Sequence, residues 1–264
     1  IGIATAVAVP EEGDEALSAE EIAALERYAD RFQRAQQLMG GGQDAESSKI
    51  LRELIAERDD VAEVHHALAI VLRYQGRADE ATRAFLRATE LSPEDAIIAR
   101  DAGLDLLERG FLADAKALLA KSMRLDGNDL ETALGLGTAL RRLGETDAAV
   151  KALEAAVALE AGSLDAHVGL AFALVRKDPV RAGEIVAPLN HNFSDVCVVH
   201  GLALEKAGKR DAARAQLVSA ARLAAPSAGG REILMEATEA LVRCADVAGV
   251  VEAAGRWCAV DATP

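Results

Sequence analysis

Aromatic residues are scarce in this chain, with five phenylalanines, two tyrosines and one tryptophan among 264 residues. A core without large rings has to be built from alanine, leucine and valine, which requires closely spaced helices. Basic residues are also few, 29 against 43 acidic ones, and the net charge of -14 argues against a nucleic-acid-binding protein, which needs a basic surface. No apolar run approaches the roughly 20 residues that span a bilayer.

Cysteine is almost absent, and the three present do not form a disulfide framework. Cys244 and Cys258 are expected on the two helices of a terminal hairpin, on the order of 15 Å apart at 1.5 Å per helical residue, too far to be bridged. Cys197 falls on an inward position and is expected to be a small core residue. The cysteines therefore permit a reducing compartment without requiring one.

What the chain does contain is a pattern that recurs every 34 residues. In the clearest unit, residues 62–95, small residues stand at unit positions 8 and 20, large apolar ones at 7, 11 and 24, and glycine at 15. Units are expected near residues 28–61, 62–95, 96–129, 130–163, 164–193 and 194–227. The small residues let two antiparallel helices approach closely, and the glycine suits a left-handed cap at the end of the first helix.

Helix boundaries are marked by capping signals. Ser18 with Glu21 predicts a capping box that starts the first long helix. Ser92, followed by Pro93, and the equivalent Ser163 and Ser194 are expected to be N-caps. The fifth unit, residues 164–193, is short and lacks the turn glycine, so Asp178 and Pro179 are expected to cap and open a short second helix there.

This pattern resembles the tetratricopeptide repeat (TPR), over about three quarters of the chain. The resemblance implies an all-α, right-handed solenoid of helix-turn-helix units, which a helical hairpin over residues 228–264 would cap. It also implies that the first helices line a concave groove that binds a peptide or helix of a partner protein, with no intrinsic catalytic residues. The lysine and asparagine pattern that clamps chaperone C-termini in some members is absent.

The groove positions follow from the resemblance. They give an acidic edge at Glu63, Glu131, Asp165 and Asp195, an apolar floor, and a basic edge that includes Arg142 and Lys206. The expected groove residues are Phe32, His66, Ile70, Arg73, Arg100, Leu104, Leu134, Thr138, Arg141, Val168, Phe172, Arg176, Val198 and Leu202. The helix dipole alone also favours acid at helix starts and base at helix ends. An apolar floor of this size is unfavourable in contact with water. It is therefore expected to be covered, either by a partner or by a superhelix that is wound tightly enough to bury it.

Catalytic, metal and cofactor sites are not indicated, so we expect a protein that is not an enzyme and has no cofactor. The glycines at 40–42 precede Ser48 and Lys49 in an order that does not fit a phosphate loop, and they are expected to form a helix-helix turn. His65 and His66 point about 100° apart on a helix and cannot chelate one metal together. His167 and His200 stand at packing positions.

The first seventeen residues are apolar and then acidic. Residues 1–9 carry no charge and fit a truncated membrane anchor, the remnant of a secretory signal or an extended arm equally well. The expected function is a scaffold or adaptor in a bacterial protein complex, either cytoplasmic or exported and membrane-associated. The alternative is a self-associating structural subunit, in which the same apolar floor would be a contact between copies.

Overall fold

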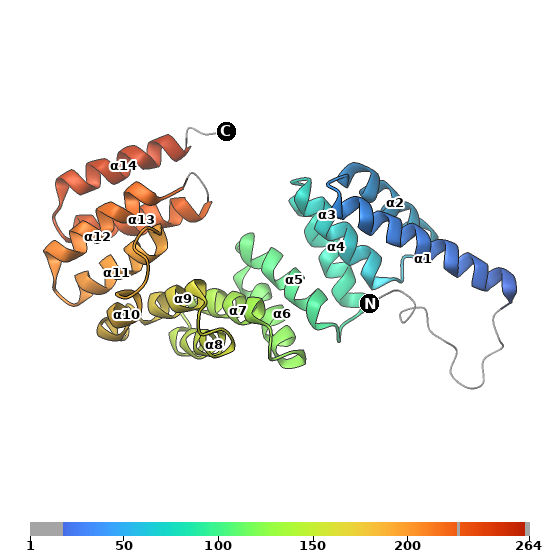
Figure 1. Ribbon diagram of the computed structural model, residues 1–264, viewed down its shortest axis with the longest axis horizontal. Coiled ribbons are helices and arrows are strands. Elements are labelled where there is room, and N and C mark those ends of the chain that lie inside the picture. Colours follow the sequence, from blue (N-terminus) through green and yellow to red (C-terminus); the bar gives the residue numbers. More distant parts are fainter. Residues whose placement is uncertain (1–17, 226–227, 262–264) are drawn as a thin grey trace. The chain divides into compact units, whose positions relative to one another are not determined.

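The structure is a computed structural model that describes residues 18–225 and 228–261, and every regular element in these ranges is a helix. The apolar arm expected at residues 1–17 lies outside them. The chain divides into two compact units, Ile1–Gly127 and Asn128–Pro264, which we describe separately. The colours of Figure 1 follow the chain through both.

The first unit consists of three antiparallel helix pairs. The pairs are α1 (Ala19–Gly40) with α2 (Asp44–Glu57), α3 (Ala62–Tyr74) with α4 (Ala78–Leu91), and α5 (Ala96–Glu108) with α6 (Leu112–Leu125). Its core is aliphatic apart from a few rings, with Leu51, Leu54 and Phe85 fully buried. The core thus follows the composition, because alanine and leucine fill most of the space between the helices.

The second unit stacks four helix pairs in the same manner. The pairs are α7 (Leu130–Arg142) with α8 (Thr146–Leu159), α9 (Leu164–Leu174) with α10 (Pro179–Val186), α11 (Ser194–Lys206) with α12 (Arg210–Leu223), and α13 (Ala228–Arg243) with α14 (Val247–Asp261). The last pair is the expected terminal hairpin. Its helix α13 packs against α11 as well as against α12 and α14 (Figure 1).

Glycine sets the distance between the helices of a pair. A Cβ atom added to Gly137 of α7 would lie 2.5 Å from Cγ of Leu153 on α8, and one added to Gly169 of α9 would lie 3.0 Å from Cδ2 of the same leucine. Leu153 therefore sits in a socket between two glycines. Gly103 and Gly201 hold Leu119 and Leu217 in equivalent sockets, as the small residue at position 8 predicts.

The helix ends confirm most of the capping signals. The turn glycines Gly42, Gly76, Gly110, Gly144 and Gly208 all have positive φ, as expected for the left-handed cap. The Ser18–Glu21 capping box forms, Ser163 accepts the amide of Ala166, and Asp178 caps α10, whose first residue is Pro179. Gly41 and Gly42 lie in the α1–α2 turn, so the glycine run is the expected helix-helix connection.

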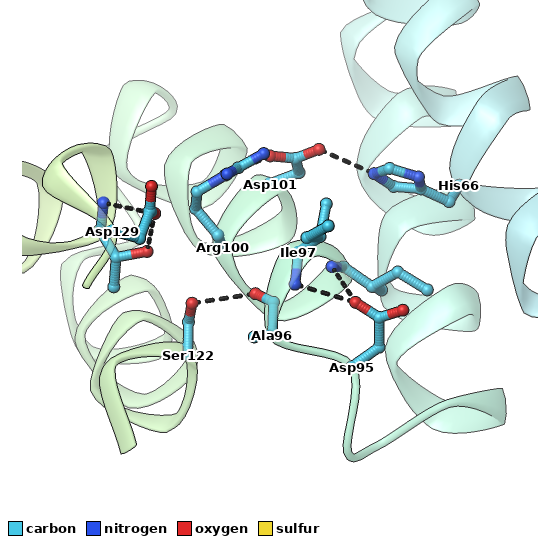
Figure 2. Close-up of polar contacts among 10 residues, drawn as sticks. His66, Asp95, Ala96, Ile97, Arg100, Asp101, Ser122 and Asp129 are labelled. Carbon is cyan, nitrogen blue, oxygen red and sulfur yellow. Dashed lines mark hydrogen bonds and ion pairs between the residues drawn. The ribbon is translucent and has the colours of Figure 1, made fainter. Parts of the chain in front are cut away.

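Two of the predicted caps are wrong. Asp95, not Ser92, is the N-cap of α5, where its side chain accepts the amides of Ile97 and Ile98 at 2.8 and 3.0 Å (Figure 2). Ser194 is the first residue of α11, after the N-cap residue Phe193. In both cases a neighbouring residue occupies the N-cap, because the chain enters the helix one to three residues away from the serine. Cys197 is fully buried as predicted, whereas the side chain of Cys258 lies outside the described residues.

Candidate functional site

The first helices of the first unit bring several predicted groove residues into one polar network (Figure 2). Nε2 of His66 on α3 lies 2.7 Å from Oδ2 of Asp101 on α5, and Nε of Arg100 donates to Oδ1 of the same carboxylate at 2.8 Å. Burial raises the pKa of Asp101, but the hydrogen bonds from His66 and Arg100 outweigh it and hold the pKa below its usual value. His66 and Arg100 therefore hold a partly buried carboxylate, which the sequence did not single out.

The rest of the predicted surface on this unit is half-buried. Ile70, Arg73 and Leu104 are partly exposed, and the guanidinium of Arg73 lies 5.8 Å from the ring centroid of Phe85. Phe32 is only 5% exposed and belongs to the core around Leu51, so its expected position on an open groove is wrong.

A pocket of about 430 Å³ lies entirely within the second unit, along the first helices of its repeats. Helix α7 contributes Thr138 and Arg141, and α9 contributes Asp165, Val168, Gly169 and Phe172; the other lining residues are Ser194, Asp195, Val198, Ala225, Gly230, Glu232, Ile233 and Glu236. Five predicted groove residues thus share one cavity: Thr138, Arg141, Val168, Phe172 and Val198.

The inner wall of the pocket is apolar. Val168 and Phe172 are partly buried and pack against the core of the unit, as does Ile233 from α13. Val198 lines the pocket but is fully buried, so it is not the solvent-facing residue that the groove pattern predicts. Leu202 is 4% exposed and does not line the pocket, and its helix α11 packs against α13.

Charged groups surround this wall. The guanidinium of Arg141 lies 4.3 Å from the ring centroid of Phe172, and its Nη2 lies 3.6 Å from Oε1 of Glu232. Burial raises the pKa of Glu236, and the like charge of Glu239 adds to the rise, against the attraction of Arg141. Leu134 is partly buried outside the pocket lining, and Arg176 is exposed and away from it.

Helix α13 is a part of this site that was not predicted from the sequence. The last hairpin was expected to be a cap, whereas Glu232, Ile233 and Glu236 line the pocket. Continuing the 34-residue register past residue 227 would have placed Glu232 and Glu236 at groove positions 5 and 9. The repeat pattern of the hairpin is too weak for this continuation to be recognised from the sequence.

In the described part of the chain, no three histidine, cysteine or carboxylate side chains gather as a metal site would require. Of the two histidines at predicted packing positions, His167 places Nδ1 2.8 Å from the carbonyl of Ser163, and the ring centroid of His200 lies 4.9 Å from that of His191. Nε2 of His65 lies 3.0 Å from the carbonyl of Asp59. Within the same described residues, no helix has both the length and the apolar character to cross a membrane.

Comparison with known protein families identifies the repeat. The sequence profile of the tetratricopeptide repeat matches residues 62–95 and, in a second version, residues 130–162. The chain contains tetratricopeptide repeats. Both matches start at the first residue of a predicted unit, and no curated protein matches the sequence.

Solved TPR structures share the fold. YrrB, described as a TPR protein with an unusual peptide-binding site, is 21% identical, with 72% of this chain and 96% of that chain covered and a TM-score of 0.56. PilF of Pseudomonas aeruginosa is 17% identical over 80% of this chain and 98% of that chain, with a TM-score of 0.59. A TPR protein of Parabacteroides merdae is 12% identical over 88% and 99%, with a TM-score of 0.64. At such identities the likeness concerns the fold alone.

Proposed function

We propose that this protein is a non-catalytic scaffold or adaptor that holds a peptide or helix of a partner protein in the pocket of its second unit. The tetratricopeptide repeats support an interaction role in general. The observation that carries the specific proposal is the 430 Å³ pocket, which residues from four successive first helices line and which has an apolar wall around Phe172. Binding pockets combine apolar side chains with polar groups that orient the ligand, and this lining contains both.

The size of the pocket fits one or two large side chains of a bound segment rather than a whole domain. The remaining affinity would come from the helix surfaces on either side, which are rigid elements and need no ordering on binding. Self-association is the alternative use of the same surface. The two uses are distinguished by the protein that binds in the pocket, which is a different protein for an adaptor and a second copy of this chain for self-association.

The proposal is tested by affinity capture from the source organism with three versions of the full chain: wild type, Phe172→Ala and Phe193→Ala. Phe193 offers a matched control because it is 50% exposed, lies in the same unit and does not line the pocket. We expect one partner to be retained by the wild type and the Phe193 variant and lost from the Phe172 variant, with similar helical circular dichroism for all three.

Capture that is equal for the two phenylalanine variants would contradict the proposal, because binding would then not use the pocket. If the retained partner is a second copy of this chain, and light scattering shows a concentration-dependent dimer that Phe172→Ala abolishes, the surface serves self-association instead.

A further inference from the structure

We propose that the segment bound in this pocket carries a lysine or arginine next to a large apolar residue. This inference rests on the proposed function and names the chemistry of the partner. It follows from the charges of the pocket lining and from how the pocket already holds a cation of its own.

Carboxylates outnumber cations around the pocket. Asp165, Asp195, Glu232 and Glu236 come from three different helices, and Arg141 is the single guanidinium among the lining residues. Asp165 and Asp195 lie in the first turns of α9 and α11, where the helix dipole alone favours an acidic residue. Glu232 and Glu236 lie beyond the first turn of α13, where this effect has faded, so the dipole does not account for them.

Glu236 is the carboxylate that has most to gain from a cation. Its pKa is raised first by burial and then by Glu239 and Glu232, against the attraction of Arg141 and Arg243. A charged group in these surroundings is disfavoured by its neighbours, and an arriving ammonium or guanidinium would relieve the repulsion. A partner carboxylate would instead add to it, so an acidic segment is rejected at this position.

Arg141 shows that the pocket accommodates a cation beside an aromatic ring. Its guanidinium lies over Phe172 at 4.3 Å from the ring centroid and 3.6 Å from Glu232, with its side chain 23% exposed. This arrangement combines a cation–π contact with an ion pair. The apolar wall of Val168 and Ile233 beside it is suited to an aliphatic or aromatic neighbour of the partner's basic residue.

The test uses a displayed library of random dodecapeptides selected on the full chain, with counter-selection on the Phe172→Ala variant to keep the peptides that use the pocket. We expect these peptides to be enriched in lysine or arginine adjacent to leucine, isoleucine or phenylalanine. Their binding, measured by fluorescence anisotropy, should weaken as salt rises, because ions screen the attraction.

Two single-charge variants then assign the cation to the pocket. Glu236→Gln should weaken the binding of the selected peptides about three- to tenfold. The matched change Glu184→Gln, at an exposed position of α10 outside the lining, should weaken it less than twofold. Arg141→Gln should strengthen binding about threefold, because it removes a competing cation from the ring of Phe172. A merely structural disturbance would weaken binding in all three variants.

The outcomes separate this inference from the proposed function. Pocket-dependent peptides that are acidic or neutral, or weaker binding to Arg141→Gln than to wild type, would overturn the inference and leave a binding pocket in place. If the peptides that bind the wild type are all removed by the counter-selection on Phe172→Ala, or if no peptide is selected above background, the proposed function and the inference are overturned together.

Discussion

The Gly137→Ala substitution should destabilise the protein even though alanine is the better helix former. In an open helix this change stabilises by about 1 kcal/mol. Here the new Cβ would lie 2.5 Å from Cγ and 2.7 Å from Cδ2 of Leu153, which is 1% exposed and also contacts Gly169. The leucine has no free space on either side, so either its rotamer or the spacing of α7 and α8 has to change.

Overpacking of this kind costs about 1–3 kcal/mol, and the gain in helix propensity returns up to about 1 kcal/mol of it. We therefore expect a net loss of about 1–2 kcal/mol, which lowers the melting temperature by about 2–8 °C for a chain of this size. Thermal unfolding followed by circular dichroism measures it.

Gly183→Ala is the matched control. A Cβ there would meet only the Cβ of Ala203, at 3.8 Å, which is ordinary van der Waals contact. This substitution in α10 should stabilise by about 0.5–1 kcal/mol. If Gly137→Ala raises the melting temperature as Gly183→Ala does, the glycine sockets do not set the helix spacing and the packing argument fails.

Three further predictions concern the caps, the hairpin and ligands. Ser18→Ala removes the capping box of α1 and should cost about 1 kcal/mol, seen as about fivefold faster amide exchange in the first turn; unchanged exchange would mean that the box contributes nothing. Hydrogen bonds from Arg243 on α13 lower the pKa of Glu205 below its ordinary value of 4.5. The ionised carboxylate should therefore stabilise the hairpin at pH values above 4.5, and this stabilisation should be lost as the pH falls through the lowered pKa. Glu205→Gln should therefore cost about 1 kcal/mol at pH 7 and progressively less toward pH 3, whereas a pH-independent cost would contradict this cause. Zinc and ATP should leave the melting temperature unchanged, because we expect neither to bind. A ligand that binds and is present at 100 times its Kd would add about 2.7 kcal/mol to the stability, so a clear rise in the melting temperature would contradict this expectation.

The packing could be predicted from the sequence because it depends on backbone geometry that repeats. A glycine at position 8 and a leucine at position 24 of one unit meet in the same way in three pairs, as Gly137 and Leu153 do in α7 and α8. The turn glycines Gly42, Gly76, Gly110, Gly144 and Gly208 were predictable for the same reason, since each adopts the left-handed conformation that ends the first helix of its pair.

The groove residues were less predictable because their exposure depends on neighbours that the register does not describe. Leu202 occupies the same unit position as the partly exposed Phe172, but it is buried on a helix that also packs against α13. The partner of His66 could not be inferred either, since Asp101 stands one position out of phase in the next unit. Glu236 joined the pocket only through a hairpin whose repeat pattern is weak.

The pocket of the second unit is the central claim, and site-specific photo-crosslinking in the source organism tests it most directly. In one variant, a benzophenone amino acid replaces Thr138 in the pocket lining. In a second variant of the same chain, it replaces Val180 of α10, which is 62% exposed and does not line the pocket. The account predicts that position 138 forms an adduct with one partner protein through a segment containing a basic and an apolar residue, and that position 180 does not. Equal adducts at both positions, or an adduct at 180 alone, would contradict it.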